Sequence, residues 1–309
     1  MRARWTDSPC KRTIVRRVRR CAALATALGV ASCGPSVLNP RGYVGAGDRQ
    51  ILLDSLAIML VIVVPVIMAT VGVAWWFRAS NTRARYMPDF VYSGSIELVI
   101  WSIPLMTIML LGGVAWVGSH DLDPAAPLPS KMPQLDVQVV SLDWKWLFIY
   151  PKQGIASVNR LVIPVGTPVH FVLTSASVMN AFFVPQLGSM IYTMNRMADR
   201  LNLIADHPGT YYGESAMISG DGFATMHFDV DAVPADQFAA WVTTAKSNGP
   251  SLDTQTYAGL AKQSMSVQPF TYRAVQPDLF LKIVTQAVPP GPGPESSPTP
   301  RAAGKALGN

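Results

Sequence analysis

The sequence has little cysteine, with Cys10, Cys21 and Cys33 the three examples in 309 residues. The first two lie in an N-terminal segment that has the layout of an export signal. Once this segment is cleaved, Cys33 is the thiol that remains. The mature chain is therefore expected to form no internal disulfide and to hold no metal between paired cysteines.

Charged residues are also scarce, at 14% of the chain against 50% hydrophobic residues, a balance typical of membrane proteins. The formal net charge is +6. However, eight of the 25 Lys and Arg, and one of the 19 Asp and Glu, lie within the first 32 residues. The remainder has 17 basic and 18 acidic residues. It therefore lacks the basic excess expected of a nucleic-acid-binding protein.

Residues 1–32 consist of a basic stretch followed by the apolar run CAALATALGVAS, which is the order of an export signal. This run is too short to cross a bilayer, which takes about 20 residues. The segment Val30-Ala31-Ser32-Cys33 resembles a bacterial lipobox, in which the cysteine is acylated and becomes the mature N-terminus. A chance small-residue cleavage site is the alternative. We predict a lipoprotein signal over 1–32 and a palmitoylated lipid anchor at Cys33.

Two runs without charge, Ser55–Phe77 and Leu98–Ser119, are long enough to span a membrane. A helix of this length, rising about 1.5 Å per residue, crosses a hydrocarbon core of about 30 Å. Transmembrane helices are therefore expected over 51–78 and 95–119, with a pair of buried core helices as the alternative.

The charges around these runs predict the orientation of the chain. Arginines gather between the two runs, and acidic residues gather on their outer flanks at Asp48, Asp54, Asp121 and Asp123. By the positive-inside rule, the loop 79–94 is cytoplasmic. Residues 33–50 and everything after the second span are then periplasmic, in a bacterial inner membrane.

After a Pro-rich linker at 120–133, short alternating runs such as LDVQVVSLDWKWLFIY, PVHFVLTS and ATMHFDV are separated by Gly, Pro, Asn and Asp. They predict an antiparallel β-sandwich over 134–232. Helical periodicity over 233–288 predicts short helices packed on the sandwich. Residues 289–309 are rich in Pro, Gly and Ser and are expected to be disordered. The predicted fold class is membrane α + β.

Two spans followed by an outward sandwich resemble subunit II of the haem–copper respiratory oxidases. In the cytochrome c oxidases of that family, a cupredoxin domain holds a two-copper centre. Its ligands come from a Cys-x-Glu-x-Cys-x-x-x-His-x-x-Met motif and from an earlier loop resembling His-x-Phe-x-Val-Pro. The stretch GESAMISGDGFATM keeps the first spacing and NAFFVP the second. The motif ligands fall on Ser215, Met217, Ser219, Phe223 and Met226, and the earlier histidine falls on Asn180.

These residues are not a copper-binding set. Two copper ions at short distance need bridging thiolates and imidazole ligands. Serine hydroxyls do not ionise at neutral pH, Phe223 has no lone pair, and Met226 alone is a weak donor. The four histidines form no pair at metal spacing; they are His120, His170, His207 and His227. We therefore expect no metal in this chain.

A retained cupredoxin-like scaffold without copper ligands resembles the quinol-oxidising members of the family. The stretches SLDWKWLFIYPKQGIASVN, SVMNAFFVPQLGSMIYTM and DHPGTYYGESAMISGDGF resemble subunit II of bo-type ubiquinol oxidases, and so does the C-terminal end with QFAAWV and PFTYRAVQPDLF. The resemblance covers roughly residues 33–285.

The resemblance implies a terminal oxidase that couples ubiquinol oxidation and O2 reduction to water with proton pumping. This chain would hold no redox centre and would support assembly and proton uptake. Subunit I would hold haem b, haem o or a related haem, and one copper. Subunits I, III and IV and the membrane would be its partners.

The resemblance also gives roles to three residues. The stretch SIELVIWSIP resembles the family pattern Leu-Glu-x-x-Trp-x-x-x-Pro, whose glutamate forms the mouth of a proton path into subunit I. Here that residue is Glu97, for which a solvated flanking charge is the alternative. Trp144 and Trp146 lie two apart on an expected β-run and so share one face. That face either contacts subunit I or belongs to the core.

Two other functions remain open. A membrane-anchored copper chaperone or sensor lipoprotein predicts clustered Met and His in the outward domain. Met190, Met194 and Met197 form a small cluster, although methionines at such spacing are more often packing residues. A lipoprotein that binds a solute or cell-wall ligand would need neither a second span nor an intramembrane acid.

The lipobox resemblance generates a prediction for Cys33. Cys33→Ser should leave an uncleaved or unacylated precursor that still assembles, because two spans anchor a chain more strongly than acyl chains do. Mass spectrometry of the N-terminal peptide measures the modification. An unmodified N-terminus at any other residue would refute the lipobox.

Overall fold

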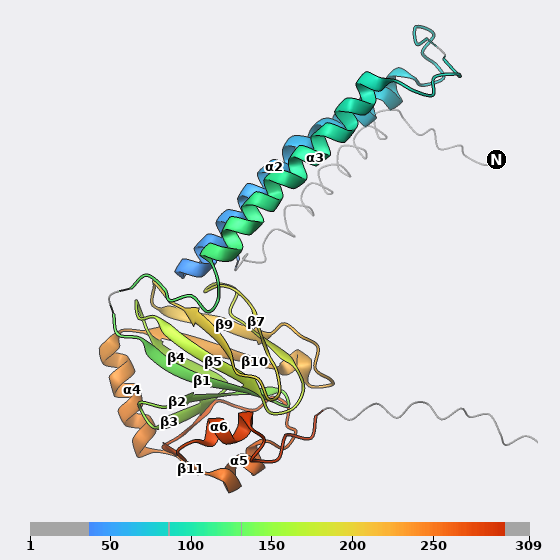
Figure 1. Ribbon diagram of the computed structural model, residues 1–309. Helices are drawn as coiled ribbons and strands as arrows, with labels where there is room; N and C mark the ends of the chain where they lie inside the picture. Colours follow the sequence, from blue (N-terminus) through green and yellow to red (C-terminus); the bar gives the residue numbers. More distant parts are fainter. Residues whose placement is uncertain (1–36, 86, 131, 294–309) are drawn as a thin grey trace, which may run out of the picture. The chain divides into compact units, whose positions relative to one another are not determined.

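The computed structural model describes residues 37–85, 87–130 and 132–293 (Figure 1). The expected signal, the lipidation site Cys33 and residues 294–309 of the expected tail lie outside the described residues. Two long helices come first, followed by the strands of a β-domain and three short helices near the C-terminal end. The expected order of apolar helices, β-sandwich and short C-terminal helices is thus confirmed.

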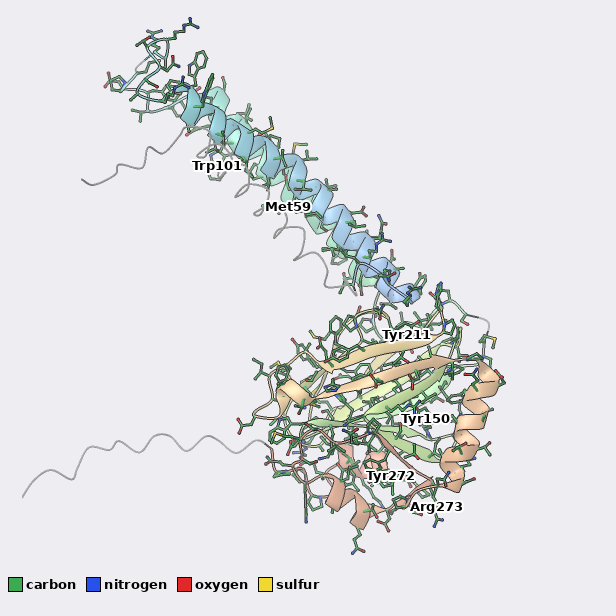
Figure 2. The ribbon with its side chains drawn as sticks, turned by 180° about the vertical axis from the view of Figure 1, so that it is seen from behind. Met59, Trp101, Tyr150, Tyr211, Tyr272 and Arg273 are labelled. Carbon is green, nitrogen blue, oxygen red and sulfur yellow. The ribbon has the colours of Figure 1, made fainter. Side chains whose placement is uncertain are left out.

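The two long helices are α2 (Tyr43–Trp76) and α3 (Gly94–Asp121). Each contains an apolar window long enough to cross a membrane, and no residue of either window is buried. Figure 2 shows side chains projecting outward along both helices, among them Met59 and Trp101. Helices that are apolar all round are suited to lipid. Helix α2 begins before the predicted start at residue 51, because the polar residues ahead of the apolar run continue the helix.

Glycines bring α2 and α3 close together. A Cβ atom on Gly118 would lie 2.4 Å from Cδ1 of Ile51, and one on Gly47 would lie 2.8 Å from both Cδ atoms of Leu122. Small residues at such points allow the backbones of membrane helices to approach. A Cβ atom on Gly113, in contrast, would meet no described atom within 4 Å. The two helices therefore touch near the start of α2 and separate beside Gly113.

The β-domain consists of two facing sheets (Figure 1). The first has the order β12-β3-β2-β1-β5-β8 and the second β4-β10-β9-β6-β7. Strands of the first sheet are β1 (Leu135–Leu142), β2 (Lys145–Tyr150), β3 (Ile155–Val158), β5 (Val169–Ser175), β8 (Asp199–Leu203) and β12 (Phe270–Tyr272). Strands of the second are β4 (Arg160–Pro164), β6 (Asn180–Phe183), β7 (Ile191–Thr193), β9 (Gly209–Ser215) and β10 (His227–Val233).

Most strand pairs are antiparallel, as expected, but β1 pairs with β5 and β4 pairs with β10 in parallel. The chain leaves the first sheet after β3, forms β4 in the second sheet, and returns to place β5 beside β1. A strand that returns by such a crossover runs parallel to its neighbour, which a local alternating pattern does not reveal.

Hydrophobic side chains form two buried clusters, one on each face of the first sheet. The cluster between the sheets includes Trp146, Phe182 and Phe228, whose rings lie 5.2 to 5.5 Å apart. The second cluster lies between the outer face of the first sheet and the C-terminal extension, residues 235–293. The extension contains α4 (Ala235–Ser247), α5 (Thr254–Leu260), α6 (Leu279–Val284) and the short strands β11 (Ser251–Leu252), β12 and β13 (Ala274–Val275).

Strand β2 contributes to both clusters. Trp146, Phe148 and Tyr150 point between the sheets, and Leu147 and Ile149 point toward the extension. Figure 2 shows Tyr150 within the sandwich, while Tyr272 and Arg273 lie in the extension. The extension is therefore a layer of the domain.

The glycine contacts predict how two matched substitutions differ. Gly118→Leu should force α2 and α3 apart at Ile51 and lower the midpoint of thermal unfolding of the full chain in mild detergent. Gly113→Leu places the same side chain on the same helix in open space and should leave the midpoint near that of the wild type. Equal midpoints for the two variants would contradict the close contact at Gly118.

Candidate functional site

The segment with copper-motif spacing, Gly213–Met226, runs from β9 through a loop to the start of β10. Its ends are joined by a backbone hydrogen bond from Ser215 N to Met226 O of 3.2 Å. The N–H of Ala216 donates to Ala181 O at 3.0 Å, which holds the segment against β6. This arrangement brings Ser215 beside Asn180, at the start of β6.

A buried network of hydrogen bonds joins these positions. Ser215 Oγ donates to Asn180 Oδ1 at 3.2 Å, and Asn180 Nδ2 donates to Ser141 Oγ at 3.4 Å and to Val178 O at 3.3 Å. The Ser141 and Thr193 hydroxyl oxygens lie 2.8 Å apart, and Thr193 Oγ1 donates to Asn180 O at 3.3 Å. Every side chain in this network is at most 3% exposed. Neutral polar groups therefore satisfy one another here.

The other motif positions surround this network. Ser219 and Met226 are buried, and Ser219 Oγ lies 4.0 Å from Met226 Sδ. Phe223 begins a short 3₁₀ turn, Phe223–Thr225, and both Phe223 and Met217 are half-buried. The structure thus brings Asn180, Ser215, Ser219 and Met226 together, with Met217 and Phe223 nearer the surface.

The donor atoms here do not fit a two-copper centre. They are hydroxyl and amide oxygens and one thioether, whereas bridged copper needs soft anionic thiolates and imidazoles. Across residues 37–85, 87–130 and 132–293, no group of three or more His, Cys, Asp or Glu is placed to hold a metal ion. The nearest histidine in sequence, His227, stacks on Tyr212 at the surface with ring centroids 5.8 Å apart.

The structure places Trp144 and Trp146 in the core between the sheets, at 7% and 0% exposure. The prediction that both lie on one β-run needs correction for Trp144. Strand β1 ends at Leu142 and β2 begins at Lys145, and Trp144 has a φ of 63° in the intervening turn. Two-residue hairpin turns favour positive φ, which explains the break in the run. The indole of Trp146 is fully buried, so it contacts this chain and presents no surface to a partner.

Glu97 lies in the first turn of α3 with an exposed side chain. Its N–H donates to Ser93 O at 3.0 Å, and a carboxylate in the first helical turn interacts favourably with the helix dipole. The side chain is therefore exposed to water, which both a proton-uptake role and a flanking charge require.

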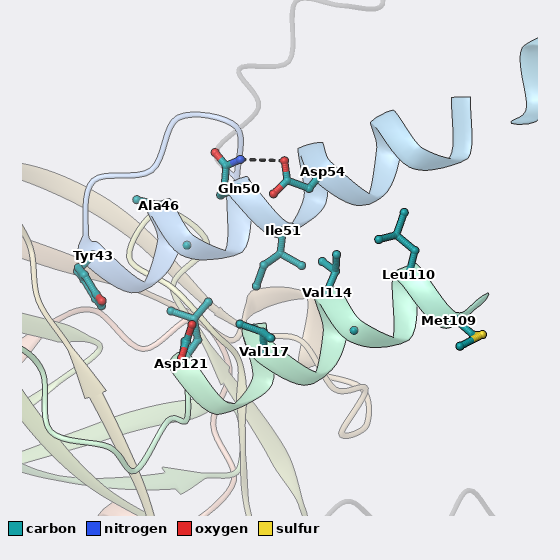
Figure 3. Close-up of a pocket in the computed structure, with 14 residues that line it drawn as sticks. Tyr43, Ala46, Gln50, Ile51, Asp54, Met109, Leu110, Val114, Val117 and Asp121 are labelled. Atoms are coloured by element: carbon teal, nitrogen blue, oxygen red, sulfur yellow. Dashed lines mark hydrogen bonds between the residues drawn. The ribbon is translucent and has the colours of Figure 1, made fainter. Parts of the chain in front are cut away.

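A groove of about 700 Å³ between α2 and α3 is a feature that the sequence predictions missed (Figure 3). Its walls are mainly apolar, and Gly113 lies on one of them. At its polar end, Gln50 Nε2 donates to Asp54 Oδ1 at 2.8 Å. The sequence features that could have predicted this groove are the adjacent glycines Gly112 and Gly113 in α3 and Asp54 at the start of the apolar run in α2.

Comparisons with known proteins agree with this geometry. Residues 137–233 match the family "Cytochrome C oxidase subunit II, periplasmic domain", and residues 246–291 match the "COX Aromatic Rich Motif". The ubiquinol oxidase subunit 2 of Acetobacter aceti is 47% identical over 279 residues, which cover 89% of this chain and 90% of the relative. The chain belongs to the ubiquinol oxidase subunit 2 family.

Two further comparisons give a second relative and a solved structure. The cytochrome bo(3) ubiquinol oxidase subunit 2 of Pseudomonas aeruginosa is 46% identical over 85% of this chain and 80% of its own. The solved periplasmic domain of cytochrome oxidase subunit II (CoxB) of Bradyrhizobium japonicum is 27% identical over 37% of this chain and 94% of that chain, with a TM-score of 0.35. The relatives confirm the resemblance to bo-type ubiquinol oxidase subunit II. They give no support to a copper chaperone or sensor.

The copper-motif spacing of the segment Gly213–Met226 predicts that substitution can create a copper site. Ser215→Cys, Ser219→Cys, Phe223→His, Asn180→His and Met217→Glu together should give a coloured copper centre, because they supply thiolates and imidazoles on a folded scaffold. Visible absorption and a metal count of the purified chain measure the result. The same set without Ser219→Cys is the control and should lack the bridged-copper spectrum. Coloured copper in the unmodified chain would contradict the assignment.

Proposed function

We propose that this chain is subunit II of a bo-type ubiquinol oxidase, a terminal respiratory enzyme that oxidises ubiquinol, reduces O2 to water and pumps protons. The observation that carries the proposal is the 47% identity with the Acetobacter aceti ubiquinol oxidase subunit 2 over 89% of the chain. The neutral Asn180–Ser215 network supports it, because that network occupies the place of copper ligands.

In this function the chain is a non-catalytic subunit without a redox centre. Subunit I would hold haem b, haem o or a related haem together with one copper, and these groups would supply the redox chemistry between ubiquinol and O2. Ubiquinol reaches the enzyme through the membrane, so electron transfer needs no copper relay in the outward domain. The polar network around Asn180 then serves to hold the domain together.

The helices α2 and α3 anchor the chain in the bacterial inner membrane, and acyl chains on Cys33 add to the anchor. The loop 79–94 lies in the cytoplasm and the β-domain in the periplasm. Subunits I, III and IV are the partners. The groove beside Gly113 is lined mainly by apolar side chains, which supports a role of this chain in assembly with other membrane helices.

Glu97 forms the mouth of a proton path into subunit I. Its exposed carboxylate lies at the start of α3, next to the loop that the positive-inside rule places in the cytoplasm. Protons for O2 reduction and for pumping are taken up from that side. A surface carboxylate can collect and release them, so the role of Glu97 is proton uptake and does not involve contact with the reacting atoms.

Purification in mild detergent tests the proposed function. Haem-containing subunits should accompany the chain, and the complex should show a reduced-minus-oxidised haem spectrum, while a metal count on the separated chain should find no copper. A copper chaperone or sensor would be purified without haem. Recovery of a haem-free, copper-loaded chain would overturn the proposal.

Proton uptake through Glu97 predicts that Glu97→Gln slows ubiquinol oxidase turnover, because the amide cannot exchange protons. Assembly and haem spectra should be unchanged, and Glu97→Asp should be milder. Asp89→Asn removes another exposed acid from the same cytoplasmic region and serves as the matched control, with turnover near that of the wild type. If Glu97→Gln keeps wild-type turnover across a range of pH, Glu97 is only a flanking charge.

A further inference from the structure

The turn between β1 and β2 is flanked by two buried charged side chains that the proposed function does not use. Lys145 is 1% exposed and Asp143 is 3% exposed. A buried charge is unfavourable unless it is paired and hydrogen-bonded, so the partners of these groups show what the turn is fixed to.

Lys145 is fixed to the C-terminal extension. Its Nζ donates to Lys262 O at 2.7 Å and to Ser264 Oγ at 2.6 Å. Burial lowers the pKa of the Lys145 amine to about 8, and the nearby Asp143 carboxylate partly opposes this change. Both acceptors follow α5, so this amine joins the first sheet to a segment 117 and 119 residues later in the chain.

Asp143 is fixed to a different part of the extension. Its carboxylate accepts hydrogen bonds from Ser177 Oγ and from the N–H of Gly293, the second at 3.0 Å. The N–H of Gly291 donates to Ala176 O at 2.9 Å. Residues 289–293 therefore form a strap that is bonded to both the turn and the loop after β5.

Trp144, between these two charges, contacts the copper-motif segment. Its Nε1 donates to Ser219 O at 3.2 Å. A Cβ atom on Gly222 would lie 2.3 Å from Cδ2 of Trp144, so the indole lies directly against the Gly222 backbone. The φ of 63° is unfavourable for a bulky residue and persists only when surrounding contacts hold it. The contacts of Asp143 and Lys145 are of that kind.

We propose that the C-terminal extension stabilises the segment 219–226, as a bound metal would in a chain with copper ligands. The extension fixes the β1–β2 turn through Asp143 and Lys145, and Trp144 in that turn then holds the segment. In a chain with copper ligands at the positions of Ser215, Ser219, Phe223 and Met226, a metal would cross-link that segment to itself, as metal sites stabilise the folds around them. Here packing and hydrogen bonds replace such a cross-link, and they connect the segment through the β1–β2 turn to the C-terminal extension.

Hydrogen–deuterium exchange on the full chain, purified in detergent with the subunits that accompany it, tests this coupling. Lys145→Met removes the amine and keeps a side chain of similar length. Lys246→Met makes the same change at an exposed lysine of the extension and is the matched control. Loss of both hydrogen bonds should make exchange of the amides in 216–226 roughly tenfold faster. The control should exchange like the wild type, and β4 should be unchanged in both variants.

A chain that ends at Val288 provides a second variant, because it keeps α6 and removes the strap with its bonds to Asp143 and Ala176. Exchange in 216–226 should again be faster than in the wild type, by a smaller factor. If 216–226 exchanges at the wild-type rate in this chain and in Lys145→Met, the extension does not hold the loop and the proposal is overturned. If Lys145→Met does not fold, the shortened chain alone decides between these outcomes.

Discussion

Every residue of strand β2 is buried, and the layers of the domain follow from that constraint. Successive side chains of a strand point to opposite faces, so a strand with large, mainly apolar residues at the five positions 146–150 needs cover on both sides. The second sheet covers Trp146, Phe148 and Tyr150, and the C-terminal extension covers Leu147 and Ile149. Each such side chain contributes about 1.5–3 kcal/mol when it leaves water, so neither layer is dispensable.

The same burial explains why the positions that align with copper ligands hold neutral groups. Inside a core, an unpaired polar atom costs about 1–3 kcal/mol, and an unpaired charge costs more. Asn180, Ser141, Thr193 and Ser215 avoid this cost because each hydroxyl or amide has a partner. The loop keeps its shape with hydrogen bonds and aromatic contacts between groups of this chain.

Part of this structure could be predicted from the sequence and part could not. The apolar helices follow from charge-free runs, and the strands follow from local alternation. The approach of Asn180 to Ser215 was implied only by the resemblance, because 35 residues separate them. The parallel strand pairs, the turn at Trp144 and the buried position of Lys145 depend on contacts distant in sequence. Lysine is ordinarily exposed, so no local pattern marks this one as buried. The groove beside Gly113 depends on how two helices are rotated, which composition does not determine.

The position of the extension at the end of the chain also imposes an order on folding. Synthesis makes the N-terminal part first, yet the acceptor of Lys145 lies 117 residues later. Until that segment arrives, the apolar outer face of β2 faces water, and contacts between distant residues form slowly. The domain is therefore complete only after the C-terminal extension has been made and has packed on the first sheet. A chain that ends before the extension leaves the hydrophobic outer face of the first sheet uncovered, and exposed faces of that kind are prone to aggregation.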